Sequence, residues 1–322
     1  MNNPLVSVVI VNYNGKKLLK TILNSLKKSS FKDYEIIVVD NASSDGSQQF
    51  VKKEHRHVKL VENKENLGYS GINSAIKHCN GKYIFFLNND MIVEKDCIAL
   101  LLQTAEKDKK IAMAAPALIN YYDKTKKSGG TWLSRAFYNG HIDSKNKKKR
   151  TLEEIPYLGV GMVKKDFVDI FGYLFDKDYF IYAEDAELGL RIRLTGNKII
   201  FNKDAVLYHM HAATSQKKNK AFNTYLMERN SLMNFFKMLS LKSIIIFAPY
   251  VFGMRVFAII RDIFTLKISN ALARIKALLW VLFNAPVICK KRKEIQKFRK
   301  ANDSYILKVF SEKYLFGRKF IV

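Results

Sequence analysis

The chain has 322 residues, of which 48% are hydrophobic, and its formal net charge is +26. This length allows a large core and two structural units, because domains usually contain about 100–200 residues. The three cysteines are odd in number, far apart and without a CxxC or Cys/His zinc spacing, which argues against a disulfide framework or a zinc module and indicates a reduced, cytosolic chain.

Strand and helix patterns alternate through the first 120 residues. Apolar, β-branched runs predict strands at 5–12, 34–40, 58–63 and 82–90, and helical spacing of apolar residues predicts helices at 16–29, 47–55 and 68–79. No basic segment or cleavage site precedes the first strand, so no signal peptide is expected. Continuous apolar strands separated by helices indicate an α/β fold with a mostly parallel central sheet.

The pattern is less regular further along. Residues 121–156 are mixed and include a lysine run at 143–150, for which a solvated loop is expected. A short strand and a helix are expected within 157–172, then a loop and an amphipathic helix within 179–196. Two short strands follow at 197–201 and 205–211. From 214 onward the pattern predicts long helices.

Basic charge is concentrated in these C-terminal helices. Residues 214–322 hold 22 Lys and Arg against 5 Asp and Glu, whereas the first 213 residues carry a net charge of only +9. Such an excess is typical of proteins that bind nucleic acid or an anionic membrane surface. A lysine-rich proteome would give the same excess without any partner.

Polar residues follow each of the first four predicted strands. In open α/β sheets, ligands bind at the carboxyl ends of the strands, so these residues predict a binding site at one sheet edge. They are Asn12, Tyr13 and Asn14; Asp40 and Asn41; Asn66; and Asn88, Asn89 and Asp90. The turn after the first strand has one glycine, which disfavours a dinucleotide-binding fold of the dehydrogenase type.

Several segments together resemble the family 2 glycosyltransferases, most closely their rhamnosyltransferase-like branch. In chain order they are VSVVIVNYNG, YEIIVVDNASSDGS, ENLGYSGINSAI, YIFFLNND, YLGVGMVKKDFVDIFG, FIYAEDAELGLRIRLTG and LYHMHAATS. The resemblance covers about residues 5–240 and implies a GT-A fold, a nucleotide-sugar donor and inversion at the anomeric carbon. It divides the chain into a catalytic domain at 1–213, with a nucleotide-binding half at 1–120 and an acceptor-binding half at 121–213, and a helical region at 214–322.

The resemblance also implies a divalent cation that binds the donor diphosphate. The family's Asp-x-Asp motif is replaced here by Asn88-Asn89-Asp90, so only Asp90 offers a carboxylate ligand, while Asn88 offers a carbonyl or a bond to the ribose. His209 matches a histidine that coordinates metal in this family. An imidazole beside a carboxylate favours Mn²⁺ over Mg²⁺. The alternatives are that Asn88-Asn89-Asp90 is an ordinary polar strand end and that His209 is a structural histidine.

Nucleotide contacts are implied for the other strand-end residues. The resemblance assigns Asp40 to the base, and a carboxylate accepts the N3–H of uracil or thymine, which favours a UDP- or dTDP-sugar; a helix N-cap is the alternative. Asn12 and Tyr13 would line the base, Asn66 would close over it, and Asn88 and Asn89 would lie beside the nucleotide. Asn14 is either a contact or a turn residue.

The catalytic base is expected at the start of the helix in 179–196. The N-terminus of a helix favours the charged form of both acids there, Glu184 and Asp185. The family motif assigns the base to Asp185, and Glu184 is expected to touch the acceptor or donor sugar. Gly159 and Gly161 would let a sugar ring approach the backbone. The alternatives are acids that merely begin a helix and glycines that serve packing.

Two uncharged apolar runs in the C-terminal region, at 243–254 and 277–289, are shorter than the about 20 residues of a membrane span. Arg255 and two prolines, Pro249 and Pro286, interrupt these apolar segments, and lysines and arginines surround them. The two runs therefore predict helices that lie on an anionic membrane surface. Packing as core helices, against the catalytic domain or a second subunit, is the alternative.

The sequence therefore predicts an inverting, metal-assisted transferase on the cytoplasmic face of a membrane. It would move a sugar from a UDP- or dTDP-sugar to a glycan or lipid-linked acceptor, without nucleic acid, and a homodimer remains open. A nucleotidyltransferase and a non-catalytic glycan-binding protein are the competing functions.

Overall fold

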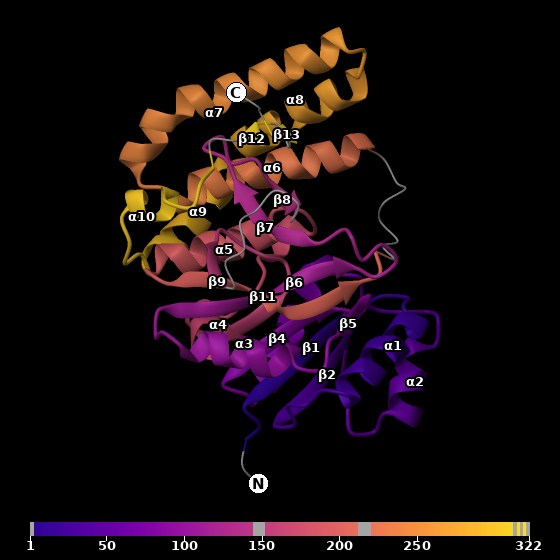
Figure 1. Ribbon diagram of the computed structural model, residues 1–322. Helices are drawn as coiled ribbons and strands as arrows, with labels where there is room; N and C mark the ends of the chain where they lie inside the picture. The colour runs from indigo at the N-terminus through magenta and orange to yellow at the C-terminus, as the bar shows by residue number, and fades with distance from the viewer. Residues whose placement is uncertain (1–2, 144–151, 212–219, 312–313, 316–317, 320–322) are drawn as a thin grey trace.

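The computed structural model describes residues 3–143, 152–211, 220–311, 314–315 and 318–319. Nearly all of the lysine run, from 144 to 150, lies outside these residues. The described part has a sheet-containing body next to the N-terminus and a group of C-terminal helices at the opposite end (Figure 1). All three cysteines are free thiols in the structure.

The four N-terminal strands form the predicted parallel layer. β1 (Val6–Asn12) lies between β2 (Tyr34–Asp40) and β4 (Tyr83–Asn88), and β3 (Lys59–Glu62) continues the sheet beyond β2. All three pairings are parallel. The register sets Asn12 opposite Asp40 and Val11 opposite Asn88, so the polar strand ends meet at one edge as predicted.

The rest of the sheet is mixed. Beyond β4 come β10 (Gly161–Lys164), β6 (Ile111–Asn120), β11 (Lys198–His209) and β5 (Met91–Val93), while β9 (Leu152–Ile155) pairs with β11. The two short strands expected at 197–201 and 205–211 are one strand, β11, with a register shift between Asn202 and Val206. A hairpin of β7 (Ser128–Leu133) and β8 (Asn139–Asp143) forms a separate sheet.

Helices accompany this sheet much as the periodicity predicts. They are α1 (Lys16–Lys27), α2 (Ser47–Glu54), α3 (Cys97–Glu106), α4 (Lys165–Phe171) and α5 (Glu184–Leu194). The helix expected at 68–79 is a 3₁₀ helix, η1 (Gly68–His78). The expectation of an amphipathic α5 is wrong, because every residue from Ala186 to Leu194 is buried, including Arg191 and Arg193.

The long C-terminal helices explain the burial of α5. They are α6 (Lys220–Met238), α7 (Leu241–Phe264), α8 (Ile268–Phe283) and α9 (Ala285–Gln296), followed by α10 (Asp303–Leu307) and the short strands β12 (Tyr314–Leu315) and β13 (Arg318–Lys319). A hydrophobic core joins Leu190 and Leu194 of α5 to Leu232 of α6 and Val281 of α8. The helical region is thus packed onto the sheet-containing body through α5 and α6.

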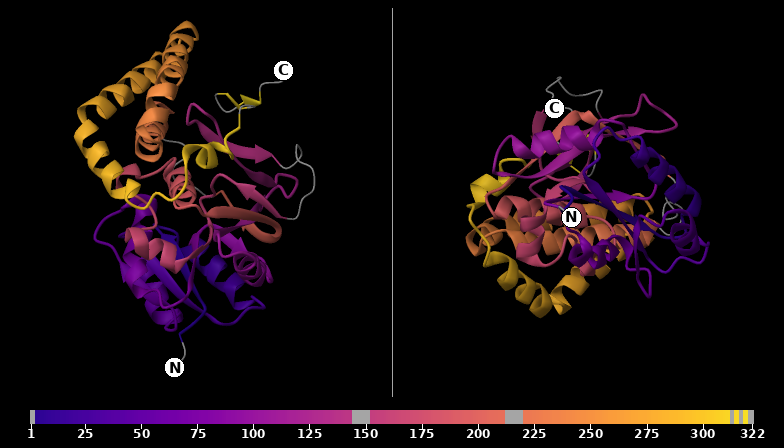
Figure 2. Two further views of the ribbon diagram at one scale, coloured as in Figure 1. Left: turned by 90° about the vertical axis from the view of Figure 1, so that its left-hand side faces the viewer. Right: turned by 90° about the horizontal axis from the view of Figure 1, so that it is seen from below.

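Helices α7 and α8 lie at the end of the molecule farthest from the N-terminus (Figures 1 and 2). The apolar runs expected to be short belong to longer helices: α7 has 24 residues and is long and apolar enough to cross a membrane, and α8 with α9 passes the same test as a pair bent by 68°. Pro249 lies inside the unbroken α7, whereas Pro286 begins α9 after the bend.

Candidate active site

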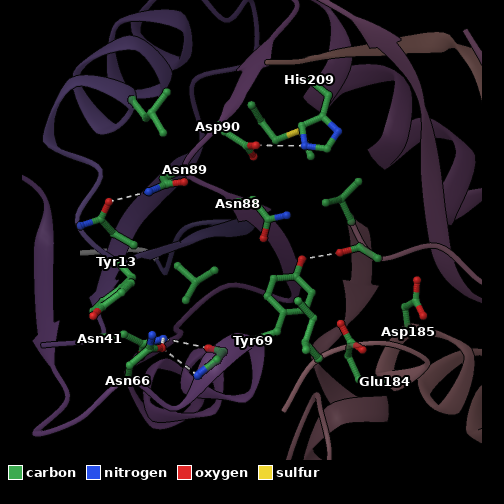
Figure 3. Close-up of a pocket in the computed structure, with 18 of the residues that line it drawn as sticks. Tyr13, Asn41, Asn66, Tyr69, Asn88, Asn89, Asp90, Glu184, Asp185 and His209 are labelled. Carbon is green, nitrogen blue, oxygen red and sulfur yellow. Dashed lines mark hydrogen bonds and ion pairs between the residues drawn. The ribbon is translucent and has the colours of Figure 1, made fainter. Parts of the chain in front are cut away.

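A cavity of about 460 Å³ opens at the carboxyl ends of β1 and β4 (Figure 3). Most of the predicted site residues line it, although they come from distant parts of the chain. They are Asn12, Tyr13, Asn14, Asn66, Asn88, Asn89, Asp90, Gly159, Glu184, Asp185 and His209. Asp40 and Gly161 are the predicted site residues that do not line the cavity.

Asp40 lies beneath the cavity and supports Asn12. It is fully buried, and its Oδ2 accepts a hydrogen bond from Asn12 Nδ2 at 2.9 Å. Its Oδ1 accepts from the backbone N–H of Ser43 and from Gln48 Nε2, both at 2.8 Å. Asn12 in turn accepts from Asn89 Nδ2 at 2.7 Å. These bonds fix the Asn12 amide at the cavity wall, whereas direct contact of Asp40 with a base stays a prediction.

The loops after β1 and β2 are tied together by Asn14. Its backbone adopts a left-handed conformation (φ 48°), its N–H donates to Ser43 Oγ at 2.9 Å, and its Oδ1 accepts from the Ser44 N–H at 2.8 Å. Asn14 is therefore a turn residue that also lines the cavity, and its contact with a nucleotide stays a prediction.

Asn41, which the sequence placed at the same sheet edge without a role, lines the cavity, and so do Tyr69 and His141, which were missed as site residues. Asn41 Nδ2 donates to the Gly68 carbonyl at 2.8 Å and lies 3.4 Å from Asn66 Oδ1, so it connects β2 to the start of η1. Its position directly after Asp40 was the available signal. No comparable sequence signal marked the other two residues. Tyr69 lies inside a helical pattern, and His141 lies in a segment without clear periodicity.

The two predicted metal ligands are neighbours. Asp90 follows β4, His209 ends β11, and Asp90 Oδ2 lies 3.0 Å from His209 Nε2. Two ligand atoms each about 2.1 Å from one cation and at right angles to each other are about 3 Å apart, so this spacing fits shared coordination. Among the described residues no cluster of three or more His, Cys, Asp or Glu has metal-binding geometry, so a cation here would need ligands from a substrate or water.

The acid pair lies on another side of the cavity, at the N-terminus of α5 (Figure 3). Asp185 Oδ1 accepts a hydrogen bond from the Ala186 N–H at 2.8 Å. Burial raises the pKa of Asp185 to about 6. Burial, and then the neighbouring Asp185 carboxylate, raise the pKa of Glu184 to about 8. The two carboxyls therefore titrate as a coupled pair that keeps a proton to higher pH than isolated acids do.

Tyr69 is bonded to the backbone beside the acid pair. Its hydroxyl donates to the carbonyl of Gly159. Burial, followed by the carboxylates of Glu184, Asp185 and Asp90, raises the pKa of Tyr69 well above its ordinary value. The phenol therefore remains a hydrogen-bond donor throughout the physiological pH range.

The two predicted glycines differ in their surroundings. A Cβ on Gly159 would lie 3.4 Å from Asp185 Oδ2, so a side chain there would occupy space beside that carboxylate. A Cβ on Gly161 would lie 2.8 Å from the Ala114 carbonyl oxygen, inside the sheet. Gly161 therefore fits the packing alternative.

Comparison with known proteins places this cavity in context. The sequence model of Glycosyl transferase family 2 matches residues 7–164. The protein named "Uncharacterized glycosyltransferase YfnE" of Bacillus subtilis (strain 168) is 26% identical over 217 residues, which cover 62% of this chain and 54% of that protein. This chain therefore spans about half the length of that relative.

Two solved structures share the fold. TarS 1-349 of S. aureus in complex with UDP matches with a TM-score of 0.55 and 19% identity, covering 93% of this chain and 90% of that chain. GalNAc-T7 with UDP, GalNAc and Mn²⁺ matches with a TM-score of 0.59 and 19% identity, covering 73% and 48%. At this identity the likeness shows the fold alone.

The chain has a GT-A-like α/β fold, and its sequence is similar to glycosyltransferases. The match to the Glycosyl transferase family 2 model ends at residue 164, and the acid pair and His209 lie beyond that end.

Proposed function

We propose that the protein transfers a sugar, with inversion, from a UDP- or dTDP-sugar to a hydroxyl group of a glycan or lipid-linked acceptor. The observation that carries this proposal is a single cavity lined by two pairs of residues. Asp90 and His209, a candidate cation-binding pair, lie on one side, and the acid pair of Glu184 and Asp185 lies on another. The two similar structures contain UDP, and that of GalNAc-T7 also contains Mn²⁺, which supports the donor class.

The nucleotide would lie along the wall formed by Asn12, Tyr13 and Asn66. Tyr13 is 40% exposed, so its ring is available to stack on a base, and the amides offer both donors and acceptors. Asp90 and His209 would hold a divalent cation, Mn²⁺ in preference to Mg²⁺, which when bound supplies positive charge to the departing diphosphate.

Asp185 would act as the general base. Its Oδ1 is bonded to the Ala186 N–H, which leaves Oδ2, on the Gly159 side, to take the acceptor's proton. As that proton leaves, the acceptor oxygen bonds to the anomeric carbon, and the bond from this carbon to the diphosphate oxygen breaks with its electron pair. Attack opposite the leaving group inverts the anomeric carbon. A protonated Glu184 would donate a hydrogen bond to a sugar hydroxyl.

We also propose that α7 and α8 dock on an anionic membrane surface. Large apolar residues are exposed along both helices, among them Ile245, Ile246, Val256, Phe257, Leu272 and Leu282. The charges expected to interrupt them face inward: Arg255 is 1% exposed and donates to Ser231 Oγ at 2.7 Å, and Arg274 donates to Asp262 Oδ2 at 2.8 Å. These exposures run against the alternative that both segments are core helices of this chain.

The basic cluster at 290–300 serves two purposes in this proposal. Lys291 pairs with Asp178 at 2.6 Å, and Arg292 donates to the Phe236 and Leu239 carbonyls, so both are structural. Lys290, Lys293, Lys297 and Lys300 are exposed and would contact lipid headgroups. The rhamnosyltransferase-like branch, the peripheral cytoplasmic location and a homodimer stay predictions.

A panel of nucleotide sugars tests the proposed function. A ligand that binds only the native state raises the melting temperature, so UDP- or dTDP-sugars should do so in the presence of Mn²⁺. Candidate glycans and lipid-linked sugars should then release the nucleotide diphosphate. Pyrophosphate release from a nucleoside triphosphate would instead indicate a nucleotidyltransferase, and stabilisation without turnover on any acceptor would indicate a binding protein.

A further inference from the structure

The segment 176–183, which leads directly into the acid pair, has an unusual backbone. Phe180, Tyr182 and Ala183 all adopt positive φ angles, of 59°, 70° and 60°. Residues other than glycine seldom adopt this conformation, and they keep it only where their surroundings enforce it. Phe180 also lines the cavity, and Ala183 directly precedes α5. The position of the acid pair therefore depends on whatever holds this segment.

Helix α6 provides the partners, although it lies about 50 residues further along the chain. Asn230 Nδ2 contacts three carbonyl oxygens of the segment, those of Tyr179 at 3.1 Å, Ile181 at 3.0 Å and Tyr182 at 2.7 Å. The side chain is fully buried. The two N–H donors of one amide group are thus shared among three carbonyl oxygens within four residues.

Asn234 and Lys237 extend the same row by one turn each. Asn234 Nδ2 donates to the Ala183 carbonyl at 3.2 Å, and its Oδ1 accepts from the Tyr179 hydroxyl at 2.6 Å. Lys237 Nζ contacts Asp176 Oδ2 at 2.8 Å and Glu187 Oε1 at 3.2 Å, which joins the start of the segment to the first turn of α5. Spacings of four and three residues place all three side chains on one helix face.

We propose that Asn230, Asn234 and Lys237, here called the loop clamp, are positioning residues that hold Glu184 and Asp185 in reactive geometry. None of the three lines the cavity, so they act through the segment 176–183 and not by touching a substrate. The C-terminal helical region is thereby part of the catalytic machinery as well as a candidate membrane contact. The inference rests on the proposed function in taking Asp185 as the base.

Asn230→Ala tests the clamp by removing all three contacts without burying a charge. We expect turnover to fall about 10- to 100-fold, because small misplacements of a catalytic group have effects of this size. The KM for the donor should change by no more than about twofold, since the donor contacts lie on other elements. Asn223→Ala, a matched substitution two turns earlier on α6, should leave both unchanged.

The pH profile separates positioning from loss of folded protein. Asp185 is faced by Glu184, Tyr69 and Tyr157, and burial raises its pKa to about 6. Loosening the segment would admit water and move this pKa down toward its ordinary value. The acid limb of the turnover profile should therefore move to lower pH in Asn230→Ala, an effect that partial unfolding does not produce.

Amide hydrogen exchange supplies a readout that does not depend on the reaction. Exchange in residues 179–186 should be faster in Asn230→Ala than in the wild type and in Asn223→Ala. Folded Asn230→Ala with unchanged turnover, pH profile and exchange would overturn the proposal. Should it not fold, Tyr179→Phe, which removes one hydroxyl bonded to Asn234, should show the same changes to a smaller degree, and their absence would be equally decisive. A wild type without transferase activity would reject the proposed function, and the exchange result would still report on the clamp.

Discussion

His209 Nε2 lies 3.0 Å from Asp90 Oδ2 although 119 residues separate the two positions. The contact forms because β5, directly after Asp90, pairs with the end of β11, with Met91 opposite His209. Both proposed ligands are thus held by one strand pair, which is a rigid arrangement for the proposed cation site. The exposed His211 ring lies against the His209 ring, with centroids 3.9 Å apart and planes tilted by 36°.

The first prediction concerns this pair. Chelator should abolish turnover and Mn²⁺ should restore it, because Asp90 and His209 offer the oxygen and nitrogen ligands that suit this ion. Asp90→Asn and His209→Ala should each raise the Mn²⁺ concentration needed for half-rescue by about 10-fold or more, since even indirect partners of a metal are worth about 10- to 100-fold. Metal titrations of the turnover rate measure this.

His211→Ala is the matched comparison for His209→Ala. It removes the neighbouring imidazole, which is not a proposed ligand, and should leave the Mn²⁺ requirement nearly unchanged. Equal effects of the two substitutions would show that the assignment of His209 as the ligand is wrong. A wild type whose turnover is indifferent to chelator would rule out the metal role of both Asp90 and His209.

The second prediction is that Asp185→Asn reduces turnover by a factor of about 10²–10⁴, as loss of a general base does. Asparagine keeps the acceptor oxygen for the Ala186 N–H, so the helix start should be preserved. Nucleotide-sugar binding, measured as thermal stabilisation, should stay close to that of the wild type. Near-normal turnover in the purified variant would rule out the assignment.

The third prediction is a bell-shaped pH profile. Asp185 must be ionised to take a proton, so activity should fall as the pH drops through about 6. Glu184 must be protonated to donate a hydrogen bond, so activity should also fall as the pH rises through about 8. The two limbs are apparent values of the pair, because adjacent carboxyls titrate together.

Glu184→Gln tests the alkaline limb specifically. Glutamine keeps a hydrogen-bond donor at the same place and does not titrate, so the loss of activity above pH 8 should disappear while the acid limb remains. An unchanged alkaline limb would show that another group is responsible and that Glu184 does not act as a neutral donor.

The N-terminal half of the site was accessible to sequence reasoning because parallel strands bring their ends together by register. Asn12, Asn66 and Asp90 could be assigned to one edge for this reason alone. The partners of the acid pair were not accessible. Asn230 and Lys237 lie inside a helix whose apolar residues dominate its pattern, and their contacts depend on how α6 packs on α5. The inward direction of Arg255 was hidden for the same reason, because hydropathy does not say which side of a helix faces protein.

The fourth prediction is that the full-length protein floats with anionic liposomes. Exposed apolar side chains on α7 and α8 would bury in the interface, and exposed lysines such as Lys290 and Lys293 would each add about 1 kcal/mol near anionic headgroups. Binding should therefore weaken as salt is raised and be weaker on neutral lipid. A carbonate wash separates a peripheral protein from one in which the 24-residue α7 spans the bilayer.

Charge placed on the apolar face tests whether α7 makes this contact. Ile246→Glu with Phe257→Glu changes two exposed positions of α7, 59% and 55% accessible, and should abolish flotation without unfolding the protein. Ile170→Glu, at a 46% exposed position of α4, is the matched control and should float normally. Turnover on a soluble acceptor should survive in the double variant, because the loop clamp on α6 is untouched, whereas turnover on a lipid-linked acceptor in liposomes should fall. A full-length protein that ignores anionic liposomes at low salt, or a double variant that floats as well as the control, would defeat the membrane proposal.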